Sequence, residues 1–205
     1  MKDTFIMSVR QAAELDHAFE RNGWTPSHIK ALSSGDMLAR ILPVVLGHAE
    51  IKPREHLIDC DAPVFCPDDW EVLPPVEQIP SRVTGQLVWN LKAVRLYLSP
   101  NQKGVKHIVG NDLRLELVEN KSQVYTAHVL DYLLKPENQH LIPEEWKGKA
   151  VFFWGTIYQH PYGSRYILFL YWFGSKWHWS YYWLGHDWIV SDPSAVLASS
   201  QSLAT

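Results

Sequence analysis

Histidines and carboxylates lie close together in two segments of the chain, and this pair of residue types can perform acid–base chemistry. In AHVLD, His128 precedes Asp131 by three residues, a spacing that puts both on one side of a helix. Further along, His178 and Asp187 lie within KWHWSYYWLGHDW. A histidine beside a carboxylate is a common general base. One candidate function is therefore a hydrolase-type enzyme with His178 or His128 as base and Asp131 or Asp187 as the acid.

No recognisable catalytic motif supports a catalytic role for these pairs. The sequence contains no glycine-rich phosphate loop, no nucleophile elbow and no HExxH motif. GNDLRLE offers Asp112, Arg114 and Glu116, of which Asp112 and Glu116 share one side of a helix, but charged residues at such spacing are also typical of solvated helix faces. The sequence assigns no catalytic residue and favours a protein that is not an enzyme.

The two cysteines lie near a histidine in HLIDCDAPVFC. Cysteine and histidine bind zinc, but the spacing of His56, Cys60 and Cys66 matches no usual structural zinc site and lacks a fourth ligand. Two cysteines are also too few for a disulfide scaffold. Free cysteines are commonly buried, so we expect ordinary buried thiols, no metal site and no cofactor.

Aromatic residues are concentrated near the C-terminal end, most densely at 176–188. The turn signals HPYGS and FGSK separate three runs rich in aromatic and β-branched residues, which predicts a three-stranded antiparallel β-meander. A two-residue turn at Gly174 and Ser175 places Phe173 opposite Lys176. This turn sets the register of the second and third strands.

The other turn sets the register of the first two strands. A loop of four residues at 161–164 places Tyr158 opposite Ile167 and Trp154 opposite Tyr171. Directly opposed residues share a face, so the meander divides into two faces. The uncharged face is predicted to be core. It holds Val151, Phe153, Gly155, Ile157, Tyr166, Leu168, Leu170, Trp172, Trp177, Trp179, Tyr181 and Trp183.

The second face combines large rings with hydroxyl groups, an imidazole and an ammonium group. Rings supply contact area at a low entropy cost and polar groups orient a ligand, so we predict a ligand-binding surface on this face. The alternative is that helices cover it and make it a second core. The predicted ligand-binding residues are Trp154, Thr156, Tyr158, Tyr171, His178, Ser180 and Tyr182.

Length and composition indicate one main folded domain. The chain has 205 residues, of which 46% are hydrophobic and 20% are charged, and this is too apolar for a disordered protein. The formal net charge is −3, with no basic segment. A protein that binds nucleic-acid phosphates usually presents a basic face, so composition argues against a nucleic-acid partner.

Residues 1–50 are predicted to form a helical segment. Ser8 is a suitable N-cap for the first helix, Thr25 caps a second helix that starts at Pro26, and SSGDMLARIL starts a third. Helix-turn-helix geometry also reads DNA, which gives a third candidate function. The second and third helices carry only Lys30 and Arg40 as basic residues, so packing or assembly is favoured.

Residues 51–205 are predicted to form an α+β domain whose aromatic-rich sheet covers 151–188. Short β-type runs separated by proline, aspartate and glycine precede residue 100, and two helices follow in GNDLRLELV and YTAHVLDYLL. Asn111 is the expected cap of the first, and Pro136 ends the second. The predicted fold is α+β, with short N-terminal helices, central short strands and helices, and a C-terminal meander.

The sequence resembles a family of small uncharacterised bacterial proteins. The resemblance lies in HLIPEEWKGKAVFFWGTIY, LYW and YYWLGHDW, which follow a GNDLR…L stretch, an HVLDYLL helix and an N-terminal segment like GWTPSHIKALSSGDML. It covers most of the chain and implies one recurrent structural unit. The resemblance implies no activity, ligand or catalytic residue.

The favoured function is a non-enzymatic binding or assembly module that uses the second face of the meander. The expected partner is another protein or a small ligand, and a homo-oligomer is among the expected assemblies. No apolar run approaches the ~18 residues of a membrane span, and the start of the sequence lacks an apolar stretch of signal-peptide length. We therefore expect a cytoplasmic protein that does not bind membranes.

Overall fold

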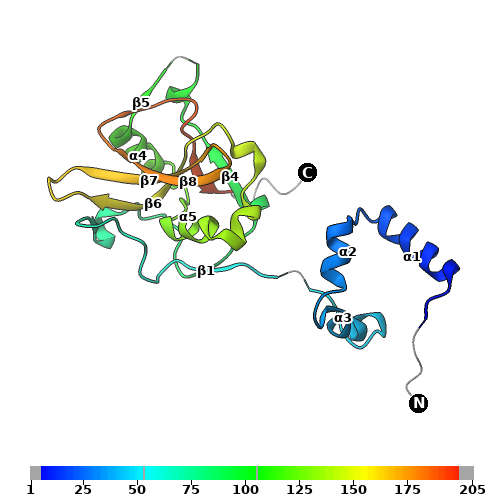
Figure 1. The fold of residues 1–205 in the computed structure, drawn as a ribbon. Helices are drawn as coiled ribbons and strands as arrows, with labels where there is room; N and C mark the ends of the chain where they lie inside the picture. The colour runs from blue at the N-terminus through cyan, green and yellow to red at the C-terminus, as the bar shows by residue number, and fades with distance from the viewer. Residues whose placement is uncertain (1–5, 53, 105, 199–205) are drawn as a thin grey trace. The chain divides into compact units, whose positions relative to one another are not determined.

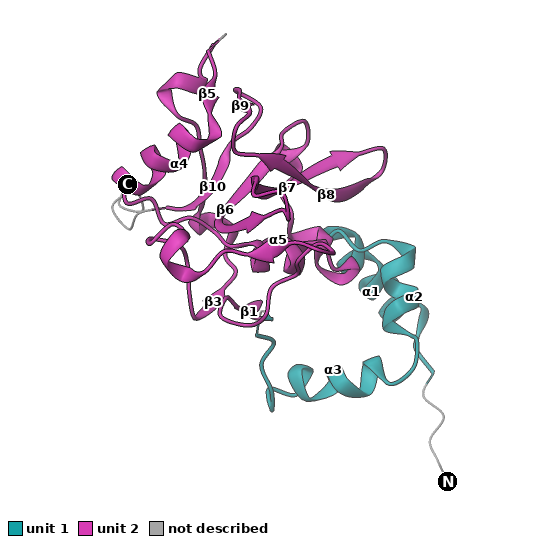
Figure 2. Cartoon of the chain, turned by 90° about the vertical axis from the view of Figure 1, so that its left-hand side faces the viewer, with its two compact units in different colours: residues 1–54 teal, residues 55–205 magenta. Residues whose placement is uncertain are grey.

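The computed structural model describes residues 6–52, 54–104 and 106–198, and it divides the chain into two compact units (Figure 2). Residues 1–54 form the first unit and residues 55–205 the second. Each unit is described separately below.

The first unit consists of the three expected helices. They are α1 (Val9–Arg21), α2 (Pro26–Leu32) and α3 (Met37–Val45). Ser8 and Gln11 form a capping box at the start of α1, and Thr25 and His28 do the same for α2. Pro43 lies inside α3 without ending it. None of the residues in these helices is buried.

The second unit is built on one main sheet with strand order β4-β10-β6-β7-β8. Its strands are β4 (Val94–Tyr97), β10 (Ser194–Leu197), β6 (Val151–Gln159), β7 (Arg165–Phe173) and β8 (Lys176–Trp183), and β2 (Glu71–Val72) also pairs with β6. Two small sheets pair β1 (Leu57–Asp59) with β3 (Gln86–Val88), and β5 (Ile108–Val109) with β9 (Asp187–Trp188). The α+β fold with its C-terminal meander β6-β7-β8 is confirmed.

Helices lie on both sides of this sheet (Figure 1). They are α4 (Gly110–Glu119) and α5 (Ala127–Leu134). Short 3-10 helices complete the unit: η1 (Pro75–Glu77), η2 (Leu91–Ala93), η3 (Pro100–Gln102), η4 (Pro136–Leu141) and η5 (Glu144–Trp146).

Each helix contributes to its own hydrophobic core. Leu130 and Leu133 of α5 are buried in a cluster with Val151, Phe153, Leu168 and Leu170, whereas Leu113 and Leu117 of α4 are buried in a cluster with Phe152, Trp154, Ile167 and Trp188. Both faces of the inner strands are therefore core.

Two features of this unit differ from the sequence prediction. Helix α4 begins at Gly110 with Val109 as its N-cap, so Asn111 lies inside the helix and is not the cap. Strand β10 follows the meander and inserts between β4 and β6, antiparallel to β4 and parallel to β6. A strand of four residues is too short to show a clear alternating pattern in the sequence. It belongs to the sheet only through its pairing with two strands that are distant in sequence.

The predicted register of β7 and β8 is confirmed over all the predicted pairs, from Phe173 opposite Lys176 to Ile167 opposite Tyr182. The turn between them has Gly174 at φ 63°, a conformation that favours glycine. A two-residue turn leaves no freedom of register, which explains why this pairing follows from sequence.

The predicted register of β6 and β7 is wrong. Tyr158 pairs with Tyr166 instead of Ile167, and a β-bulge lies between Phe152 and Ile157. The bulge contains Gly155 and Thr156, and it breaks the alternation of side chains between the two faces. As a result, Tyr158 lies in the core cluster on the α5 side, and Ile157 lies in the cluster on the α4 side.

The segment that leads into α5 holds the bulge. The Gly155 N–H donates to the carbonyl of Tyr125 at 2.9 Å, and the Ala127 N–H donates to Thr156 Oγ1 at 3.0 Å. A Cβ at position 155 would lie 2.9 Å from Tyr125 O and 2.9 Å from Thr126 Cγ2. Only glycine allows this approach between the two segments.

We therefore expect Gly155→Ala to lower the free energy of unfolding by about 1–3 kcal/mol, because the added methyl group collides with a buried backbone. Ser175→Ala in the exposed turn serves as control and should change stability by less than about 0.5 kcal/mol. Urea denaturation followed by circular dichroism measures both values. Equal stability of the two variants would show that the bulge does not require glycine.

Candidate functional site

The residues predicted to bind a ligand do not share one face. Trp154 and Tyr158 are fully buried and belong to opposite core clusters, and Thr156 in the bulge is buried as well. The bulge separates these three side chains, which the predicted register placed together. The sequence carries one signal of this bulge, because an isolated glycine inside a strand, here Gly155, often marks a bulge or a close approach of another backbone.

The remaining predicted residues stay together on the α4 side of the sheet, in β7 and β8. They are Tyr171, His178, Ser180 and Tyr182, all half-buried. The rings of Tyr171 and His178 stack with centroids 5.7 Å apart. Tyr182 packs edge-on against buried Trp188, so it also supports the core. The inner part of this face is therefore a second core, as the alternative interpretation predicted.

The face predicted to be core is buried at Trp177 but open along the rest of β8, which corrects that prediction. Trp179, Tyr181 and Trp183 are 37%, 47% and 43% exposed. Helix α5 covers the inner strands on this side, and β8 is the outermost strand of the sheet. Alternation of residue types identifies a face correctly, but the sequence does not show how far a covering helix extends.

Six aromatic rings lie in this open region, and we call them the aromatic edge. It consists of Phe65, Trp70, Tyr166, Trp179, Tyr181 and Trp183. The Trp70 ring lies 4.6 Å from that of Tyr166 and 4.9 Å from that of Tyr181, and Phe65 lies 4.9 Å from Trp179. Tyr166 stands directly opposite Trp183 in the sheet. Phe65 and Trp70 come from the loop between β1 and β2, so sequence proximity could not reveal the group.

The outer edge of β8 has no strand beside it within the described ranges of the chain. In an antiparallel pair, alternate residues direct their backbone N–H groups toward the partner strand, and those between direct them away. The two-residue turn fixes Phe173 and Lys176 as a hydrogen-bonded pair. The Leu184 N–H follows this pattern and donates to Arg165. The outward N–H groups therefore belong to Trp177, Trp179, Tyr181 and Trp183.

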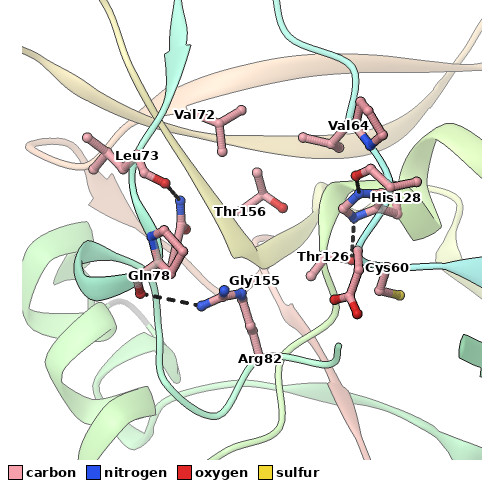
Figure 3. Close-up of a pocket in the computed structure, with 14 residues that line it drawn as sticks. Cys60, Val64, Val72, Leu73, Gln78, Arg82, Thr126, His128, Gly155 and Thr156 are labelled. Carbon is pink, nitrogen blue, oxygen red and sulfur yellow. Dashed lines mark hydrogen bonds between the residues drawn. The ribbon is translucent and has the colours of Figure 1, made fainter. Parts of the chain in front are cut away.

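A separate pocket with a volume of about 540 Å³ lies beside the bulge, on the α5 side (Figure 3). Cys60, Thr126 and His128 are grouped on one side of it, and Gln78 and Arg82 lie on the other. Val64, Val72 and Leu73 contribute apolar surface. Thr156 of the bulge also lines the pocket. This predicted ligand-binding residue therefore lies at the pocket, and not on the mixed face where the predicted register placed it.

A hydrogen bond connects two of the three polar side chains on the first side of this pocket. Thr126 Oγ1 lies 3.1 Å from His128 Nδ1. His128 Nε2 lies 2.7 Å from the carbonyl of Ala62. Burial raises the pKa of the Cys60 thiol above its ordinary value of 9.0. The thiol is therefore protonated near neutral pH.

The histidine–carboxylate pairs expected from sequence are arranged differently. His128 bonds to Thr126 and Ala62, and its neighbour in sequence, Asp131, lines a second pocket. Asp187 lies 3.6 Å from His107 in an exposed pair, and His178 stacks on Tyr171. The hydrogen-bond partners that the structure gives His128 are a hydroxyl and a carbonyl.

In the described part of the chain, no group of three or more histidine, cysteine, aspartate or glutamate side chains could hold a metal ion. None of the helices in the described ranges has the length and apolar character that crossing a bilayer requires.

No protein-family model, curated protein or solved structure matches this chain. DNA binding by α1–α3 stays a prediction.

Alanine substitutions of Trp154 and Tyr171 test how deeply the two side chains are buried, through their effects on stability. Trp154→Ala should lower the free energy of unfolding by about 3–5 kcal/mol, because a fully buried indole leaves a large cavity. Tyr171→Ala should cost about 1 kcal/mol, because this ring is only half-buried. Chemical denaturation monitored by circular dichroism measures the difference. Comparable losses in the two variants would contradict the burial described above.

Proposed function

We propose that the chain is a non-enzymatic assembly module that binds a second copy of itself through the free edge of β8. The two copies of β8 pair as antiparallel strands about a two-fold axis, and the aromatic edges of both copies line the joint. The observation that carries the proposal is the coincidence of outward N–H groups and exposed rings at three alternate positions of one edge strand, Trp179, Tyr181 and Trp183.

The length and composition of β8 suit it to pairing. It has eight residues, whereas strands are commonly about 5–6 residues long. Proteins usually protect exposed edges with charged residues, proline or bulges. In β8, Lys176 at the first position is the one charged residue, and the segment 177–183 contains no proline. Strand addition to this edge therefore buries no charge from that segment.

The strand is also complementary to itself. With the two-fold axis at Ser180, Trp179 of one copy stands opposite Tyr181 of the other, and Trp177 stands opposite Trp183. All four positions carry the outward N–H groups, so new hydrogen bonds form together with the ring pairs between Trp179 and Tyr181. Cross-strand aromatic pairs contribute about 0.2–1 kcal/mol each.

A small ligand or an unrelated protein fits this edge less well. In a two-fold dimer, each type of contact forms twice, because both copies contribute the same N–H groups and rings. The two β8 edges also cover each other, so the joint leaves no unpaired strand edge. The half-buried residues Tyr171, His178 and Ser180 lie on the opposite face of the same strands, where they flank the joint. The proposed contact surface thus shifts from the mixed face to the edge strand.

Sedimentation velocity over a range of protein concentrations tests this assembly. The wild-type chain should show a dimer fraction that rises with concentration. Tyr181→Ala should weaken the dimer through the loss of two ring pairs, and Tyr181→Pro should weaken it further, by about 30-fold or more, through the loss of one outward N–H in each copy. Proline is tolerated on an edge strand where its nitrogen faces solvent.

Ser180→Ala is the matched control, since the Ser180 N–H points toward β7 and its small side chain lies on the other face. This variant should dimerise like the wild type. A wild-type chain that stays monomeric at ~100 µM, a concentration at which specific interfaces are populated, would refute assembly through this edge. Unchanged dimerisation of Tyr181→Pro, with native circular dichroism, would do the same.

A further inference from the structure

We infer that the pocket beside the bulge binds a small aliphatic monocarboxylate, whose carboxylate group pairs with Arg82 and whose chain lies against the apolar part of the wall. This is a binding role, so it is compatible with a non-enzymatic module. It is also independent of the assembly proposed for β8, because none of the pocket residues belongs to that strand.

Arg82 gives the pocket its preference for an anion. The residue is half-buried, and its Nη1 makes one long hydrogen bond, 3.5 Å, to the carbonyl of Pro75. Within the described ranges of the chain, no carboxylate forms an ion pair with its guanidinium group. The planar fork of N–H donors on a guanidinium group matches both oxygens of a carboxylate. A ligand carboxylate therefore provides the counterion that the described part of the chain lacks at this position.

Buried hydrogen bonds hold this side of the pocket in place (Figure 3). Gln78 is 5% exposed, and its Nε2 donates to the carbonyls of Leu73 and Ile157 at 2.7 and 3.1 Å. Its Oε1 accepts the Ile157 N–H at 2.7 Å, and the Arg82 N–H donates to the carbonyl of Ile79. These bonds tie the segment before Arg82 to β6. The pocket is therefore largely formed before a ligand enters, which keeps the entropy cost of binding low.

The hydroxyl group of Thr156 is a second donor at the same cavity, between its two sides (Figure 3). Thr156 is 3% exposed, and its Oγ1 accepts the Ala127 N–H at 3.0 Å. A hydroxyl oxygen that accepts one hydrogen bond still has its own hydrogen to donate. Buried donors are stabilised by an acceptor, and a carboxylate oxygen is a strong one.

The side of the pocket that faces away from Arg82 also suits an anion. Helix α5 begins there, because its N-cap residue Thr126 lines the wall. The N-terminal end of a helix carries a partial positive charge, which adds to the attraction of Arg82 for an anion. The Cys60 thiol on this side is protonated, because burial raises its pKa, so it adds no negative charge.

Asp61 limits the charge of the ligand. This residue also lines the pocket, but it is exposed, so water and salt screen its carboxylate from the rest of the site. The pocket thus contains one arginine and one aspartate. A single negative charge on the ligand can pair with Arg82, whereas a second would add repulsion from Asp61. A monocarboxylate therefore fits better than a dicarboxylate.

The apolar part of the wall defines the rest of the ligand. Val64, Val72 and Leu73 line the pocket and offer contact to methylene groups. The cavity volume of about 540 Å³ is in the usual range for small-molecule sites. A short aliphatic chain attached to the carboxylate uses both parts of the wall.

Isothermal titration calorimetry with sodium hexanoate tests this site in the full wild-type chain. We expect saturable binding of one hexanoate per chain, and affinity that rises about 2- to 4-fold for each methylene group from butanoate to hexanoate. Hexanamide keeps the chain without the charge, and adipate carries a second carboxylate. Both should bind about 10-fold more weakly than hexanoate, because the first loses the charge-assisted bond and the second meets Asp61.

Two results with the wild-type chain would overturn the inference. One is the absence of saturable binding at ~20 mM hexanoate, which is well above the Kd of a weak specific site. The other is an affinity for hexanamide or adipate equal to that for hexanoate, at matched ionic strength.

Substitution of Arg82 tests the residue that pairs with the carboxylate. Arg82→Gln should weaken hexanoate binding by about 10-fold or more and leave hexanamide binding unchanged, whereas Arg82→Lys should retain part of the affinity. Arg95→Gln is the matched control, because Arg95 is exposed on β4 and does not line the pocket. Wild-type affinity in Arg82→Gln, with a native circular dichroism spectrum, would contradict the pairing.

The two cysteines report where hexanoate binds. Cys60 lines the pocket, whereas Cys66 lies outside its wall and its thiol donates to the carbonyl of Trp70. Saturating hexanoate should slow the alkylation of Cys60 by iodoacetamide and leave the rate at Cys66 unchanged, as measured by peptide mass spectrometry. An unchanged rate at Cys60 under saturation would place hexanoate elsewhere and refute binding in this pocket.

Discussion

The contact between the β6 bulge and the segment before α5 is the constraint on which much of the second unit depends. Gly155 and Thr156 exchange hydrogen bonds with the backbone at Tyr125 and Ala127, and no side chain larger than glycine fits at position 155. This contact fixes which β6 side chains face α4 and which face α5. It also positions Thr126, which lines the pocket and bonds to His128, so the sheet and the pocket share one anchor.

The two sides of the second unit show how burial and exposure are distributed over one sheet. Helices α4 and α5 cover the inner strands, where Phe152, Phe153 and Trp154 are almost fully buried. The same coverage does not reach Trp179, Tyr181 and Trp183 of β8. Large rings left at an unpaired edge have an unfavourable exposure to water, and pairing with a second strand would remove it. The assembly that we propose through β8 would complete the burial that the single chain leaves unfinished.

Local signals in the sequence were sufficient for much of the fold. The caps Ser8 and Thr25 predict the starts of two helices because an N-cap acts within one turn of the chain. The turn at Gly174 predicts the register of β7 and β8 for a similar reason, since its length is fixed by two residues. The register of β6 was not predictable in this way, because the contact at Gly155 involves residues about thirty positions earlier in the sequence.

The sequence by itself determined the helices, the short central strands, the meander and the alternation of aromatic residues along β8, all of which depend on neighbouring residues. Only the tertiary structure decided which alternate set is exposed, because that depends on where α5 ends and which strand is outermost. It likewise decided the site residues, because Phe65 and Trp70 join the rings of β8, and Cys60 lines one pocket with Thr126 and His128, although these segments lie far apart in the sequence.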